Sequence, residues 1–220
     1  MASYKEKIQK SYIGFAVLWV GTKCSLRCRD CGNLIPFSGQ ESYKMDVIIS
    51  DLKKLLEICK VDKLQIQGGE PFTHPDIDML ITVIDELDIP EIVITTNGTI
   101  NIKQSTIDLI KKVEHSNFSI IISTYNCVKE KQVKLYERLK SNGINVILYN
   151  FFNNDNKWVR LGDIIADQND DTEIIKEKYK SCDFKICATL ADGWLYRCGR
   201  GKVIIEVLGL EYGAFDCLNL

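Results

Sequence analysis

The chain has 220 residues, 45% of them hydrophobic and 26% charged, and a formal net charge of -2 at pH 7. This composition is that of a globular protein with one sizeable core, and the small net charge gives no reason to expect nucleic acid as a partner. No uncharged apolar run reaches the roughly 18 residues that a membrane span needs. The charged N-terminus, MASYKEKIQK, lacks the apolar stretch of a secretory signal. We therefore expect a cytoplasmic protein with no membrane partner.

Short β-rich segments alternate with helical patterns along the chain. From the second segment onward the β-rich runs recur about every 27 residues, roughly the length of one strand–helix unit. This alternation predicts an α/β fold with a parallel sheet, and periodicity alone leaves open a doubly wound sheet or a full or partial barrel. The predicted strands are Ile13–Val20, Lys63–Gln67, Glu91–Thr95, Phe118–Ser123 and Asn145–Asn150. The predicted helices are Ile48–Cys59 with Asp46 as N-cap, Ile77–Leu87, Ser105–Val113 and Gln132–Lys140.

Polar, glycine-rich or cysteine-bearing sequence follows each of the first four predicted strands. In parallel α/β architectures the carboxyl ends of the strands share one edge, and the active site lies there. The sequence therefore predicts a site at this edge. The segments concerned are Cys24–Cys31, Gly68–Pro71, Thr96–Gly98 and Ser123–Asn126.

Three of the nine cysteines form the pattern Cx3Cx2C, at Cys24, Cys28 and Cys31. In a reducing compartment clustered thiols more often bind metal than form disulfides. A short loop lets three thiolates converge on one [4Fe–4S] cluster and leaves one iron without a protein ligand. The alternative is a zinc site completed from elsewhere in the chain, since no Cys or His lies between Cys31 and Cys59.

This cysteine pattern after the first strand, together with Gly68-Gly69-Glu70 after the second, resembles the radical S-adenosylmethionine (SAM) superfamily over roughly residues 13–150. The resemblance implies a partial (β/α)6 barrel in which the open iron is chelated by SAM. It also implies that the Gly68–Glu70 turn binds the SAM amino group, with Ser123, Thr96 and Asn97 as further SAM-contacting candidates. One position departs from the family, which usually has an aromatic residue just before the third cysteine, where this chain has Asp30.

The same resemblance implies a reaction. The reduced cluster passes an electron to SAM, a carbon–sulfur bond breaks, and the 5′-deoxyadenosyl radical that results removes a hydrogen atom from a substrate. An external one-electron reductant of the flavodoxin or ferredoxin type would supply the electron. The protein would orient the groups and exclude water.

A second cysteine group lies near the C-terminus, where Asp192-Gly193 predicts a tight hairpin. It resembles the SPASM domain and the shorter twitch extension, and it implies an auxiliary [4Fe–4S] cluster; structural zinc and free thiols remain alternatives. We therefore divide the chain into a radical SAM barrel, residues 1–165, and a twitch-like region, residues 166–220. The four cysteines are Cys182, Cys187, Cys198 and Cys217.

Small relatives of this plan oxidise secondary alcohols, so we expect dehydrogenation or epimerisation of a small polar molecule, such as a sugar, an aminocyclitol or a nucleotide sugar. The alternatives are a peptide-modifying maturase, a glycyl-radical activase and, outside enzymes, a zinc-binding interaction module. The activase is disfavoured because Trp19–Lys23 replaces its usual Gly-Pro-Gly segment. Lys157, Trp158 and Arg160 lie where a substrate could be held.

Overall fold

The computed structural model describes residues 10–149, 171–182, 184–213 and 216–220. Its strands form one eight-stranded sheet over these residues, in the order β5-β4-β3-β2-β1-β6-β7-β8. Strands β1 to β6 run parallel, whereas β7 and β8 are antiparallel additions. The strands are β1 Ser11–Trp19, β2 Cys59–Gln67, β3 Glu91–Thr96, β4 Phe118–Ser123, β5 Val146–Tyr149, β6 Cys187–Ala191, β7 Trp194–Tyr196 and β8 Cys217–Asn219.

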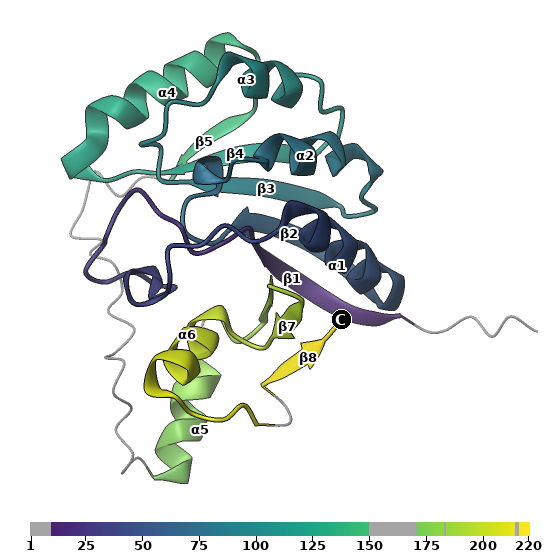
Figure 1. Ribbon diagram of the computed structural model, residues 1–220, viewed down its shortest axis with the longest axis vertical. Coiled ribbons are helices and arrows are strands. Elements are labelled where there is room, and N and C mark those ends of the chain that lie inside the picture. Colours follow the sequence, from purple (N-terminus) through teal and green to yellow (C-terminus); the bar gives the residue numbers. More distant parts are fainter. Residues whose placement is uncertain (1–9, 150–170, 183, 214–215) are drawn as a thin grey trace, which may run out of the picture.

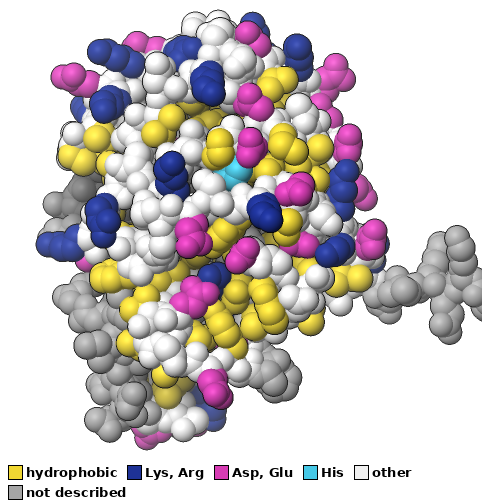
Figure 2. Space-filling view, in the orientation of Figure 1, with side chains coloured by type: hydrophobic (Ala, Val, Ile, Leu, Met, Phe, Trp, Pro, Cys, Tyr) yellow, Lys and Arg dark blue, Asp and Glu magenta, His cyan; other side chains and the backbone are white. Residues whose placement is uncertain are grey.

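Helices cover one face of the parallel part of this sheet. Figure 1 shows α1 to α4 lying in a row along β1–β5, as expected when every strand–helix–strand crossover has the same hand. On this face of β2 the side chains of Leu64 and Ile66 are fully buried in the core. On the surface shown in Figure 2, positive and negative side chains are interspersed. The helices are α1 Met45–Ile58, α2 Ile77–Thr82, α3 Gln104–Ile110, α4 Lys129–Ser141, α5 Thr172–Ser181 and α6 Gly199–Leu208.

The predicted strands and helices of residues 10–149 are present, although several begin or end at other residues. Cys59 is buried as expected, but it begins β2 instead of ending a helix, because it pairs with Ser11 of β1. Lys44 takes the N-cap position of α1, so Asp46 lies in the first helical turn. The predicted helix 77–87 stops at Thr82 and continues as a separate 3-10 turn.

The C-terminal segment joins the main sheet, which the sequence did not predict. The predicted hairpin is confirmed, with Asp192 and Gly193 both at positive φ between β6 and β7. Its first strand, β6, also pairs in parallel with β1, from Phe15 to Leu18. The boundary at 165/166 and the residues Lys157, Trp158 and Arg160 lie outside the described residues. No described helix is long and apolar enough to cross a bilayer.

Candidate functional site

A cavity of about 890 Å³ opens at the carboxyl ends of the strands and extends along the sheet face opposite α1–α4. Gly68, Gly69 and Ser123 line it, so the polar segments after the strands meet at one edge, as predicted. Cysteines of both groups line the same cavity, namely Cys24, Cys28, Cys31, Cys182, Cys187 and Cys198. Two groups of thiols more than 150 residues apart in the chain therefore line one cavity.

The first cysteine group lines the cavity as three half-buried thiols. Burial, together with the nearby Cys31 and Cys24, raises the pKa of Cys28 to about 11. Soft thiolate ligands are the donors that iron–sulfur clusters use. Among the described residues no group of three His, Cys, Asp or Glu side chains is arranged to hold a single metal ion. The donor chemistry of this group fits a [4Fe–4S] cluster.

Gly68 and Gly69 lie directly against the backbone that leads into the first cysteine group. A Cβ atom at Gly69 would lie 2.1 Å from the Lys23 carbonyl oxygen, and one at Gly68 would lie 2.2 Å from that of Gly21. Gly68 also has φ +129, a conformation that favours glycine. The backbone N–H of Gly69 donates to the Gly21 oxygen at 3.0 Å. The two glycines therefore allow the turn and the cysteine loop to pack together.

The Glu70 carboxylate faces away from the cavity, into the turn after β3. It is 1% exposed and accepts hydrogen bonds from the Thr96 hydroxyl at 2.8 Å, from the Asn97 backbone N–H at 2.6 Å and from the Phe72 backbone N–H at 3.1 Å. Burial raises its pKa to about 7. The structure thus brings Gly68 and Gly69 to the cavity, whereas the Glu70 side chain joins this turn to the neighbouring one.

Asn97 lies at the cavity wall beside the first cysteine. Its Nδ2 donates to Cys24 Sγ at 3.7 Å and to Ser25 Oγ at 3.0 Å. Its Oδ1 accepts from the Thr99 backbone N–H at 3.0 Å. Because a backbone N–H can only donate, this bond fixes the amide oxygen toward Thr99 and the amide N–H groups toward Cys24. Asn97, a predicted SAM contact, therefore also contacts a predicted cluster ligand.

Two cavity-lining residues near the cysteines were missed by sequence reasoning. Tyr125 follows Ser123 after β4, and burial raises its pKa well above the usual range, with the nearby Cys28 contributing. Arg200 lies at the start of α6, and both Cys198 and Cys31 are close enough to influence its pKa. Tyr125 belongs to a polar segment that the sequence did single out. Arg200 had no such signal, because its approach to Cys31 depends on the docking of α6.

In the second cysteine group the structure brings together three of the four predicted ligands. Burial, together with the nearby Cys198 and Cys182, raises the pKa of Cys187 to about 11. Cys217 instead pairs with Tyr196 across β7 and β8 and lines a separate, smaller pocket. Cys217 is therefore set apart from the thiols that line the main cavity.

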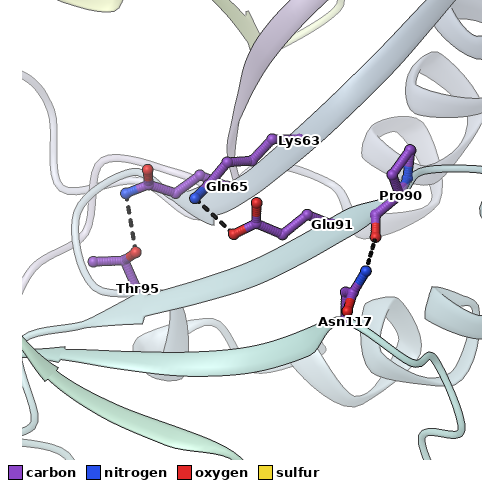
Figure 3. Close-up of polar contacts among 6 residues, drawn as sticks. All are labelled: Lys63, Gln65, Pro90, Glu91, Thr95 and Asn117. Atoms are coloured by element: carbon purple, nitrogen blue, oxygen red, sulfur yellow. Dashed lines mark hydrogen bonds and ion pairs between the residues drawn. The ribbon is translucent and has the colours of Figure 1, made fainter.

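A row of polar side chains on β2 and β3 lines the cavity, namely Lys63, Gln65, Gln67 and Thr95. Figure 3 shows Lys63, Gln65 and Thr95 of this row. Gln65 Nε2 donates to Thr95 Oγ1 at 2.9 Å and to Gln67 Oε1 at 2.8 Å. Lys63 Nζ forms an ion pair with Glu91 Oε1 at 2.7 Å. The sequence did carry a signal for this row. Lys63, Gln65 and Gln67 place a polar side chain at every second position of β2. A strand of a parallel sheet that is covered on both faces would instead be apolar throughout.

Curated relatives were found over part of the chain. A probable GTP 3′,8-cyclase of Methanocella arvoryzae is 27% identical over 97 residues, which cover 40% of this chain and 30% of the relative. Molybdenum cofactor biosynthesis protein 1 of Dictyostelium discoideum is 27% identical over 168 residues, covering 74% of this chain and 24% of the relative. The matched regions thus span 24% to 30% of the relatives' own length.

A similar solved structure is Streptococcus suis SuiB bound to the precursor peptide SuiA, with 24% identity and a TM-score of 0.48, covering 63% of this chain and 33% of that one. The profile of the Radical SAM superfamily matches residues 20–161. That range contains the three-cysteine loop, the Gly68–Glu70 turn and strands β2 to β5. The chain belongs to the Radical SAM superfamily.

Proposed function

We propose that this protein binds a [4Fe–4S] cluster through Cys24, Cys28 and Cys31 and cleaves SAM in the adjoining cavity. The observation that carries the proposal is that these three thiols and the Gly68-Gly69 turn line one cavity. Bound there, the cluster would supply the electron that converts SAM into methionine and a 5′-deoxyadenosyl radical. The electron would come from an external reductant of the flavodoxin or ferredoxin type.

The chain's own residues would bind and enclose the reactants. The Gly68-Gly69 turn offers backbone groups at close approach, and Ser123 and Asn97 offer polar atoms at the cavity wall. The C-terminal segment supplies Phe184 and Ile186 to the same cavity, and apolar side chains there would help to exclude water from a reactive radical.

We also propose an auxiliary [4Fe–4S] cluster on Cys182, Cys187 and Cys198. Support comes from their common position at the cavity and from the influence of Cys182 and Cys198 on the pKa of Cys187. Three protein ligands would leave one iron with a vacant coordination position, in contrast to the closed four-cysteine site expected from the sequence. Because Cys217 lines another pocket, we leave it out of this ligand set.

The substrate that we propose is a small polar molecule from which a hydrogen atom is removed. The cavity volume of about 890 Å³ is of the size that holds a small-molecule ligand. Among the substrates expected from the sequence, similarity to a probable GTP 3′,8-cyclase favours nucleotide chemistry over a free sugar or an aminocyclitol. Dehydrogenation and epimerisation are outcomes that follow hydrogen abstraction, and the identity of the substrate would decide between them.

Anaerobic reconstitution with iron and sulfide tests both clusters. The wild type should bind about eight irons per chain, two cubes of four, and dithionite with SAM should yield 5′-deoxyadenosine. A Cys24→Ala, Cys28→Ala, Cys31→Ala variant should produce none, while Cys217→Ala serves as the matched control with wild-type iron and product. A Cys182→Ala, Cys187→Ala, Cys198→Ala variant should retain about four irons. Continued 5′-deoxyadenosine formation by the first variant, or zinc in place of iron, would refute the proposal.

A further inference from the structure

The polar row on β2 and β3 has hydrogen-bonding groups left over for a ligand. Gln65 uses both N–H groups of its amide, on Gln67 Oε1 and Thr95 Oγ1. Three groups then remain without a partner among the described residues: the Gln65 carbonyl oxygen, the Gln67 amide N–H groups and the Thr95 hydroxyl proton. All three side chains are half-buried and line the cavity. The row therefore presents both acceptors and donors to whatever occupies the cavity.

The choice of donor and acceptor along the row is adjustable. A concerted rotation of the two Gln amides exchanges their roles, so that Gln65 accepts from Gln67 and from Thr95. That arrangement leaves N–H groups of Gln65 and the carbonyl oxygen of Gln67 for the ligand. In both arrangements the row offers a donor beside an acceptor, and it carries no charge.

The neighbouring charged residues neutralise each other. The Lys63 ammonium lies 2.7 Å from Glu91 Oε1 and 5.9 Å from the centroid of the Phe15 ring. This end of the row therefore holds an ion pair with no net charge. A phosphate or carboxylate group of a ligand would gain little there, whereas a neutral hydrogen-bonding group would fit.

Apolar side chains border the row on both sides. Val17 of β1 is the register partner of Gln65, and Ile121 of β4 is the register partner of Thr95. Both Val17 and Ile121 line the cavity. A polar strip between two apolar strips suits a flat ligand that has a polar edge and apolar faces better than a polyol with hydroxyl groups on all sides.

The geometry points to a substrate subsite in which Gln65, Gln67 and Thr95 bind the amide edge of a planar heterocycle, that is, the N–H and adjacent C=O of a lactam such as a nucleobase carries. This inference rests on the proposed function, because it assumes that the cavity holds the substrate. It adds the chemical class that the cavity would recognise and the residues that would recognise it.

Two nucleosides that differ only at the lactam edge give a direct test. Inosine carries the N–H and C=O groups, and purine riboside lacks both, while the ribose is the same. Binding would be measured by calorimetry on the reconstituted protein with SAM present. Because one hydrogen bond is worth about 1 kcal/mol and tenfold in affinity about 1.4 kcal/mol, the loss of two bonds should weaken binding by tenfold or more. Inosine should therefore bind at least tenfold more tightly than purine riboside.

Variants connect this preference to the row. Gln65→Leu removes one of the two bonds, so it should weaken inosine binding by about fivefold and leave purine riboside binding unchanged, which reduces the preference. Thr95→Val, which keeps the side-chain shape, should reduce the preference in the same direction. Gln104→Leu, on the exposed surface of α3, is the matched control and should keep the wild-type preference.

Several outcomes would overturn the inference. A subsite that recognises the lactam edge would be excluded if the two nucleosides bound equally tightly or if neither bound. It would also be excluded if Gln65→Leu weakened the binding of both nucleosides equally. Tighter binding of myo-inositol, or of a blocked dipeptide as the source of the amide, would assign the row to another class of ligand. Iron content and SAM binding are measured on the same samples. Their loss would count against the proposed function, whereas their retention with no preference for inosine would count against this inference alone.

Discussion

At the scale of single residues, Glu70 is the buried carboxylate whose ionisation affects stability. Burial raises its folded pKa from 4.5 to about 7, so between these values the folded state binds more protons than the unfolded state. Stability should then fall as pH rises from about 4.5 through about 7, by roughly 3 kcal/mol for this shift. Urea unfolding of the metal-free, reduced protein at pH 5 and pH 8 measures this loss. Glu70→Gln should remove most of it, and an identical pH dependence in the two proteins would contradict the assignment.

Asn97 gives a second prediction at this scale. Its amide N–H is directed at Cys24 Sγ, and hydrogen bonds to a cluster sulfur favour the reduced, more negatively charged cluster. Asn97→Ala should therefore lower the midpoint potential of the cluster on the first cysteine group. A redox titration followed by electron paramagnetic resonance checks this, with the exposed Asn101→Ala as control. An unchanged potential in Asn97→Ala would show that the contact does not act on the bound cluster.

At the scale of elements, the start of α6 is packed tightly against β1. A Cβ atom at Gly199 would lie 2.6 Å from Trp19 Cζ2 and 3.1 Å from the side chain of Thr189, whose hydroxyl also accepts from the Gly199 N–H. Gly199→Ala should destabilise the protein by about 1–3 kcal/mol in chemical unfolding, because this contact cannot relax without moving the helix.

The matched control for this contact is Gly201→Ala in the same helix. Its Cβ atom would meet the nearest atom, Cys198 Cβ, at an ordinary 3.6 Å. Alanine also favours a helix over glycine by roughly 1 kcal/mol. The two substitutions should thus have opposite signs, and a loss of stability of equal size in both would show that packing on Trp19 is not the cause.

At the scale of the whole molecule, the pairing of β6 with β1 makes the C-terminal segment part of the main sheet. The parallel strands β1–β5 and the β6–β7 hairpin should then unfold together. Tryptophans report on both parts, since Trp19 is buried in β1 and Trp194 is an exposed residue of β7. In a Trp158→Phe background, variants that keep only Trp19 or only Trp194 should give the same denaturant midpoint. An earlier transition for Trp194 would instead reveal an independent C-terminal unit, as the sequence division at residue 165 predicts.

The local features of this protein could be predicted from short stretches of sequence. The strand–helix alternation, the polar segments after the strands, the Cys24–Cys31 loop and the Asp192-Gly193 hairpin each depend on residues that are close in the chain. The steric demand of glycine at Gly68 and Gly69 likewise acts on the immediate turn. The geometry of such features is determined by residues within one short segment, and the family resemblance rested on these features.

Tertiary structure decided which of these residues share a space. The Glu70 carboxylate points toward the end of β3, where the Thr96 hydroxyl and the Asn97 N–H donate to it. Cys217 lies apart from the second cysteine group because β8 pairs with β7. The polar row of Gln65 and Gln67 faces a cavity whose walls come in part from the C-terminal segment. These outcomes depend on pairing and burial between segments far apart in the chain, and the spacing of residues within one segment does not encode them.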